Sequence, residues 1–177
     1  MIYDLVKDND PILHQPTERF DFSNHPIDPY ELVANLKETM IANKGIGLAA
    51  NQVGLPYRVF VVGSPDDPDN IFSFFNPLVV DAAEETVLIE EGCLSYPGLF
   101  MKVKRPASCR IRYADENGNV TTNVFDGVPA RAILHEYDHM DGVTFHQRAS
   151  KYHLEQAKKQ KKKLDRLRER NKFKLSN

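Results

Sequence analysis

The sequence lacks an apolar run long enough to cross a membrane, and it contains few cysteines. No apolar run reaches about 18 residues, which excludes a transmembrane helix. Residues 1–8 do not contain a basic stretch followed by an apolar one, so we expect no secretion signal and a cytoplasmic location. Cys93 and Cys109 are the only cysteines, and a disulfide between them is not expected in a reducing compartment.

The composition is typical of one soluble domain, and the charge is concentrated in a basic tail. The chain has 177 residues, of which 41% are hydrophobic. Residues 151–177 contain 11 lysines and arginines but three acidic residues, a net charge of +8, whereas the rest of the chain has a net charge of −10. A basic tail on an acidic body predicts an anionic partner. A solvated helix that keeps the protein soluble is the alternative explanation.

The pattern of apolar and turn residues predicts three helices and several strands. Asp28 and Pro29 are typical of a helix start, and Gly45 is expected to end this first helix. A second helix is predicted from about Pro129 to Gly142. The other predictions are a third, basic helix at residues 150–170 and strands at residues 58–62, 72–75, 86–89, 108–113 and 120–125. The last two strands are expected to form a hairpin across an Asn-Gly turn.

The most informative motif is His135-Glu136-Tyr137-Asp138-His139. Positions four apart on a helix lie on one face, about 6 Å from each other, so both histidines can bind one divalent metal. The carboxylate of Glu136 then lies where it can take a proton from metal-bound water. We expect all three residues on the polar face of the second helix. Because the motif also arises by chance on solvated helices, it does not establish a metal site alone.

Two further segments contain candidate site residues. Residues 91–95 place Cys93 after a strand and beside a glycine, where its thiolate either faces a ligand or is structural. Cys109 lies in an alternating, strand-like run and is interpreted as a small buried hydrophobe. Residues 45–52 are rich in small side chains and lack the lysine of a phosphate loop, so an extended ligand can approach the backbone. Gln52 in this segment can direct its amide at a polarised carbonyl.

Three blocks of the sequence together resemble the peptide deformylase family. They have the order and approximate spacing of the family, and they are residues 45–52, 91–95 and 135–139. The resemblance implies a catalytic domain at residues 1–148, followed by a basic C-terminal helix or tail at residues 149–177. It also implies an α+β fold in which antiparallel β-sheets pack around a central metal-bearing helix.

The resemblance implies a metal-dependent hydrolase that removes the formyl group from N-formylmethionyl peptides and releases formate. The implied metal ligands are Cys93, His135 and His139. Water is expected in the fourth position, and the ion favoured in the family is Fe²⁺, with Zn²⁺, Ni²⁺ or Co²⁺ also found. Glu136 is the implied general base and acid. The Gln52 side chain and the Leu94 backbone N–H are implied to stabilise the oxyanion.

The resemblance also implies where the substrate lies. The N-terminus of the nascent chain is expected to add as a strand between two segments. The residues of these segments are Gly45, Ile46, Gly47, Glu91 and Gly92. The candidates for the methionine pocket are Ile46, Ile89, Val128 and Ala132. Each of these four aliphatic residues is equally compatible with a place in the core.

Some positions near the metal motif depart from the family pattern. Leu134 stands where a glutamine is common before the first ligand, and Met140 stands where a leucine is common after the second. The change at Leu134 removes a polar side chain from the surroundings of the metal. We also expect an ion pair between Arg105 and Asp138 that supports the metal-bearing helix, with a surface arginine and an exposed acid as the alternative.

Two other functions are compatible with parts of the pattern. A zinc metalloprotease shares the two-histidine motif, but its third histidine falls here on Phe145, and His146 is one residue late. A metal-stabilised binding module requires four protein ligands, whereas the sequence offers three and a glutamate. The partners we expect are formylmethionyl peptides and, through the basic tail, the ribosome, with no membrane and a monomeric chain.

Overall fold

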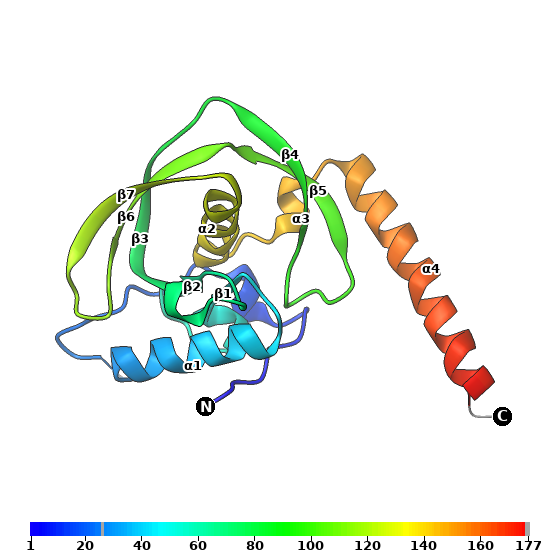
Figure 1. Cartoon of the computed structure of the whole chain (residues 1–177), viewed down its shortest axis with the longest axis horizontal. Helices are drawn as coiled ribbons and strands as arrows, with labels where there is room; N and C mark the ends of the chain where they lie inside the picture. The colour runs from blue at the N-terminus through cyan, green and yellow to red at the C-terminus, as the bar shows by residue number, and fades with distance from the viewer. Residues whose placement is uncertain (26, 176–177) are drawn as a thin grey trace.

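The central element of the fold is helix α2 (Gly127–Met140), which lies between two antiparallel β-sheets (Figure 1). The computed structural model describes residues 1–25 and 27–175, with side chains described up to residue 170. Five strands form the larger sheet in the order β1-β2-β3-β6-β7, and β4 and β5 form the smaller sheet. The strands are β1 (Gly47–Ala49), β2 (Val59–Val62), β3 (Phe72–Ala82), β4 (Thr86–Gly92), β5 (Phe100–Pro106), β6 (Ser108–Ala114) and β7 (Val120–Asp126). The predicted α+β fold is confirmed.

Local capping explains where the first helix begins. In α1 (Pro29–Ala42), the side chain of Asp28 accepts a hydrogen bond from the backbone N–H of Glu31 at 3.0 Å. The helix ends at Ala42, slightly before the predicted end at Gly45. The other helical segments are α3 (Phe145–Arg148), α4 (Lys151–Leu175) and the 3₁₀ turns η1 (Pro11–His14), η2 (Ala50–Val53) and η3 (Pro68–Asn70).

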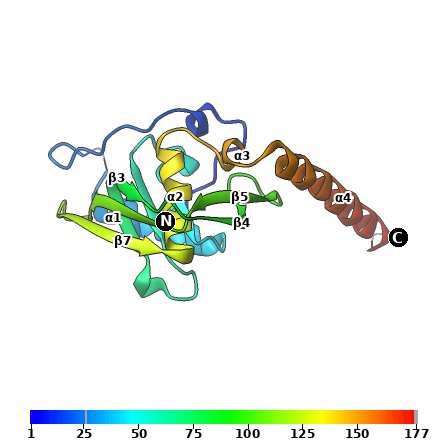
Figure 2. The same cartoon turned by 90° about the horizontal axis from the view of Figure 1, so that it is seen from above.

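Helix α4 projects from the body of the molecule beyond α3 (Figures 1 and 2). Its buried side chain Ala157 packs with residues of β5, whereas most of its length is exposed and charged. This matches the prediction of a basic helix with only a thin apolar stripe. None of the helices in the described part of the chain is long and apolar enough to cross a membrane.

Five strands were predicted at the positions of β2, β3, β4, β6 and β7, although β3 and β4 extend beyond the predicted residues 72–75 and 86–89, and the short strand β1 was not predicted. Strands β6 and β7 form the expected hairpin, and Gly118 in its turn has a φ of +80°, a conformation that favours glycine. Strand β5 was missed. Its inward positions are Met101, Val103 and the charged Arg105, and this buried arginine hides the alternation of apolar and polar residues.

The two sides of α2 have different surroundings. Ala130 and Ile133 pack against Phe60, Phe74 and Ile111 of the larger sheet, and burial of each large side chain stabilises the fold by roughly 1.5–3 kcal/mol. The opposite side of α2 carries the two histidines and the glutamate of the motif. We expected a polar face, but these three side chains are buried because β1 and the smaller sheet cover them. This arrangement places the motif inside the molecule.

Candidate functional site

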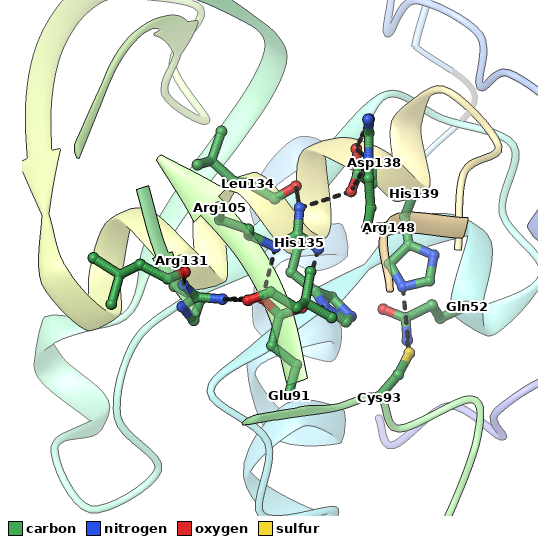
Figure 3. A network of polar contacts seen from close by, with 12 residues as sticks. Gln52, Glu91, Cys93, Arg105, Arg131, Leu134, His135, Asp138, His139 and Arg148 are labelled. Carbon is green, nitrogen blue, oxygen red and sulfur yellow. Dashed lines mark hydrogen bonds and ion pairs between the residues drawn. The ribbon is translucent and has the colours of Figure 1, made fainter. Parts of the chain in front are cut away.

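Cys93, His135 and His139 come together beside α2. Each residue offers one ligand atom, and these atoms lie within 4.8 Å of one another. The Sγ of Cys93, which follows β4, is 3.4 Å from the Nε2 of His139 (Figure 3). One thiolate and two imidazoles are a donor set that fits a tetrahedral divalent ion with one position left for water or substrate. The predicted ligands are therefore brought together.

Glu91 orients the first histidine. The Nδ1 of His135 donates a hydrogen bond to the Glu91 carboxylate at 3.0 Å, which leaves the Nε2 of the ring for a metal. Arg105 contacts the same carboxylate through Nε at 2.6 Å and Nη2 at 3.0 Å, and Arg131 contacts it at 2.6 Å (Figure 3). Burial alone raises the pKa of Glu91, but the hydrogen bonds from His135 and Arg105 hold this pKa at about 2.

A second buried carboxylate, that of Asp138, joins α2 to two arginines. Arg105 donates to Asp138 at 2.8 Å, and Arg148 of α3 donates to it at 2.6 Å. Arg105 also donates to the backbone carbonyl of Leu134 at 3.3 Å. The expected pair between Arg105 and Asp138 is confirmed, and it is part of a larger network that also contains Glu91.

Glu136 is buried beside the three metal-binding candidates, and its environment suits proton transfer. Its Oε2 has no hydrogen-bond partner among the described residues. Burial raises the pKa of this carboxyl group to about 7, the range that suits a group that both accepts and returns a proton. The side chain lies directly against β1, since a β-carbon at Gly47 would be 2.5 Å from Glu136 Oε1. Only glycine at this position leaves room for the carboxylate.

Gln52 is buried in the wall of the cleft, and both the oxygen and the nitrogen of its side-chain amide form hydrogen bonds. Its Oε1 accepts a hydrogen bond from the backbone N–H of Ala49 at 2.8 Å, and its Nε2 donates to Ser95 at 3.0 Å and to the Sγ of Cys93 at 3.5 Å. Leu94 lies close to the small-residue segment, because a β-carbon at Gly45 would be 2.7 Å from its Cδ1. Small residues in this segment therefore allow close packing around the site.

Sequence reasoning missed Asn51, Ser95 and Arg131. The Nδ2 of Asn51 donates to the backbone carbonyl of His139 at 2.8 Å, which holds the end of α2 against η2. Ser95 accepts from Gln52, and Arg131 donates to Glu91. These residues could have been proposed from their positions, because each lies within or beside a sequence block that already contained candidate site residues.

Most residues of the site line a cleft of about 740 Å³, whereas the predicted ligand His139 is buried behind its wall. Of the predicted site residues, those that line it are Gly45, Ile46, Gly47, Gln52, Ile89, Glu91, Gly92, Cys93, Leu94, Val128, His135 and Glu136. Ala132 does not line the cleft. It is buried in the hydrophobic core with Ile133, because its side chain faces the larger sheet.

The geometry does not support the metalloprotease alternative. Phe145, at the position of that class's third histidine, is buried, and its ring centre is 5.7 Å from that of His135. His146 is not in the ligand cluster, and its Nδ1 lies 3.3 Å from the hydroxyl of Thr144. Within the described residues, the metal-binding cluster consists of Cys93 and the two helical histidines.

Comparison with known proteins supports the resemblance to peptide deformylases. The profile of the polypeptide deformylase family matches residues 2–155. The chain belongs to the peptide deformylase family. A peptide deformylase from Cytophaga hutchinsonii is 41% identical over 150 residues, which cover 82% of this chain and 80% of the relative. The family is metal-dependent, and its members remove the N-terminal formyl group from formylated polypeptides, so this chain is a deformylase that acts on formylated peptides.

Solved deformylase structures have the same fold. The peptide deformylase from Synechococcus elongatus in complex with actinonin has a TM-score of 0.82 and 34% identity, and the match covers 88% of this chain and 85% of that one. The Met-Ala-Ser-bound class I type b deformylase from Acinetobacter baumannii has a TM-score of 0.77 and 31% identity, with coverages of 84% and 98%. The division of the chain into a catalytic domain at residues 1–148 and a basic C-terminal helix or tail at residues 149–177 stays a prediction.

Proposed function

We propose that Cys93, His135 and His139 hold one divalent ion and that Glu136 carries the proton transfers of deformylation. The observation that carries the proposal is the buried, unpartnered Oε2 of Glu136 beside a cluster of three ligand atoms. A bound ion would supply Lewis acidity, lowering the pKa of a water molecule and polarising the formyl oxygen. Fe²⁺ is the ion we propose, although thiolate and imidazole also suit Zn²⁺, Ni²⁺ and Co²⁺.

In the proposed reaction Glu136 acts twice. Its carboxylate first accepts a proton from the attacking water, whose oxygen forms a bond with the formyl carbon. The bond between this carbon and the methionine nitrogen then breaks, and Glu136 returns the proton to the leaving amine. The products are formate and a peptide with a free N-terminus.

Gln52 and Leu94 are the proposed donors to the oxyanion that develops on the formyl oxygen. The Gln52 amide is positioned for this role because Ala49 holds its Oε1, so its Nε2 points towards Cys93 and Ser95. The Leu94 backbone N–H adjoins the proposed ligand Cys93 in the sequence. Donors fixed in this way stabilise developing charge without the cost of reorientation during the reaction.

The formylated peptide is proposed to bind as an added strand. Among the described residues, β1 pairs only with β2 and β4 pairs only with β5, and residues at the other edges of β1 and β4 line the cleft. The edge residues proposed to bind the substrate are Gly45, Ile46, Gly47, Glu91 and Gly92. The exposed side chains of Ile46, Ile89 and Val128 at the cleft are the proposed wall of the methionine pocket.

The basic helix α4 is proposed to dock on the ribosome, where formylated nascent chains emerge in the cytoplasm. Its exposed lysines and arginines supply the charge that a phosphate backbone attracts. We further propose that the protein acts as a monomer. Truncation after Ser150 is expected to weaken co-sedimentation with ribosomes, and the binding of the full chain is expected to fall steeply with salt. Equal binding by the two proteins would contradict the docking proposal.

The decisive experiment measures formate release from formyl-Met-Ala-Ser by anaerobically purified protein, with metal content quantified. Glu136→Ala is expected to reduce kcat by roughly 10²- to 10⁴-fold while metal is retained, because the general base is lost and the ligands remain. Cys93→Ala is expected to lose both metal and activity. Cys109→Ala is the matched control, since this cysteine is buried in the core away from the cleft.

Two results would contradict these assignments. Metal-loaded wild-type protein that releases no formate would contradict the deformylase mechanism. A Cys93→Ala variant that keeps its metal and still releases formate would remove this cysteine from the proposed ligand set.

A further inference from the structure

Two hollows in the surface of the molecule share one wall. The connection between β4 and β5 includes Gly98 and Leu99, which line the active-site cleft. Leu99 also lines a second, more open groove of about 380 Å³, whose other side is α4. Helix α4 contacts β5 and runs past the end of the β4–β5 hairpin (Figures 1 and 2). The groove and the cleft therefore lie on either side of the segment that contains Leu99.

The groove along α4 is positively charged. Its basic lining residues are Lys158, Lys161, Lys162 and Arg166, and its acidic ones are Asp165 and Glu169. Lys161 pairs with Asp165 at 3.1 Å. Among the described side chains, Lys162 and Arg166 have no carboxylate within ion-pair distance. Two cations in the groove are therefore available to an acidic ligand.

Lys161 lies between the groove and the cleft. A β-carbon at Gly98 would lie 4.0 Å from the Nζ of Lys161, so this ammonium group is close to a residue that lines the cleft. Lys161 is half-buried against the body of the protein, unlike the neighbouring lysines. Because an extended chain advances about 3.3 Å per residue, a peptide that leaves the cleft beside Gly98 reaches the groove within a few residues.

We propose that the α4 groove extends the substrate site and favours formylated peptides with acidic residues after their first three positions. The proposal rests on the deformylase function and names the substrate chain itself as the occupant. Two observations support this occupant: the cleft and the groove adjoin at Leu99, and Lys162 and Arg166 in the groove are unpaired among the described side chains. Ribosome docking, in contrast, uses the charge of the whole helix. Exposed charges interact weakly and are screened by salt, so the preference is modest and depends on ionic strength.

The test compares formylated dodecapeptides that share formyl-Met-Ala-Ser and then carry four aspartates, four asparagines or four lysines within positions 4 to 9. In low salt, the aspartate peptide is expected to have a kcat/KM about three- to tenfold higher than the asparagine peptide, through a lower KM. The lysine peptide is expected to be slower than both. The differences are expected to shrink at salt concentrations of about 0.5 M.

Two matched double variants test whether the groove causes the preference for acidic peptides. Lys162→Gln with Arg166→Gln removes the two unpaired cations of the groove and is expected to abolish the preference. Lys159→Gln with Lys163→Gln removes two exposed cations at the same spacing that do not line the groove, and is expected to leave the preference unchanged. Both variants are expected to cleave formyl-Met-Ala-Ser like the wild type.

The outcomes separate this inference from the proposed function. If the wild type releases no formate from formyl-Met-Ala-Ser, the proposed function is overturned. The fluorescence anisotropy of labelled dodecapeptides would in that case still measure their binding to the groove. Equal rates and equal binding for the three long peptides would overturn the inference. Ribosome binding that depends on Lys162 and Arg166, without a preference among the peptides, would assign the groove to RNA instead and also overturn it.

Discussion

His135 donates a hydrogen bond from its Nδ1 to the carboxylate of Glu91 at 3.0 Å, and this contact sets the direction of the ring. The geometry leaves Nε2 available to a metal beside Cys93. Glu91 was expected to bind substrate through its segment, and the structure adds a role for its side chain inside the protein. The hydrogen bonds from His135 and Arg105 lower the pKa of this carboxyl group and keep it ionised, and Arg131 forms a further ion pair with it.

Replacing Glu91 with glutamine is expected to weaken metal binding by roughly 10- to 100-fold, because the ring of His135 loses its charged partner. Competition with a chelator under anaerobic conditions measures the affinity. The control is Glu90→Gln, the exposed neighbour on the same strand, which is expected to bind metal like the wild type. Equal affinity of the Glu91→Gln protein and the wild type would show that Glu91 does not support the ligand.

Replacing Arg105 with alanine is expected to destabilise the protein by about 3–5 kcal/mol, because two buried carboxylates, Glu91 and Asp138, lose a shared cation. Urea unfolding of the metal-free protein measures the change. Arg110→Ala is the control, since Arg110 is exposed on β6 and is expected to change the free energy of unfolding by less than about 0.5 kcal/mol. If the Arg105 variant has unchanged stability and activity, the ion-pair network does not support the metal-bearing helix.

Acid is expected to destabilise the metal-free protein through Glu91. The pKa of this group is about 2 in the folded protein, below its ordinary value of 4.5. Its contribution is therefore fully present above about pH 4.5 and is lost as the pH falls towards 2, and the shift corresponds to about 3 kcal/mol. The gap in unfolding free energy between wild type and Glu91→Gln should narrow over this range. A gap that stays constant from pH 6 to pH 3 would contradict the assignment.

Adding a methyl group at Gly47 is expected to displace Glu136, since a β-carbon there would lie 2.5 Å from its Oε1 and 2.9 Å from its Cδ. Gly47→Ala should lower kcat strongly and destabilise the protein by about 1–3 kcal/mol. A double-mutant cycle gives the control. In a Glu136→Ala background the same substitution should cost much less, because the clashing carboxylate is gone. Additive effects of the two substitutions would exclude the clash.

Part of the site was predictable because it depends on the spacing of residues that are close together in the sequence. The four-residue interval between His135 and His139 places both rings on one face wherever the segment is helical. The cap at Asp28 and the Asn-Gly turn before β7 likewise act over a few residues, and both were predicted correctly. The resemblance of three short blocks to peptide deformylases then supplied Cys93, which lies far from the histidines in the sequence.

Local sequence patterns were thus enough to predict the helix cap, the hairpin turn and the placing of His135 and His139 on one face of a helix. The contacts between distant segments became known from the folded chain. The tertiary structure joined Glu91 to Arg105, Arg131 and His135, turned Ala132 into the core instead of the cleft, and buried the polar face of α2 under β1 and the smaller sheet. Periodicity specifies the face of an element on which a side chain lies, whereas the partner of that side chain depends on contacts between distant segments.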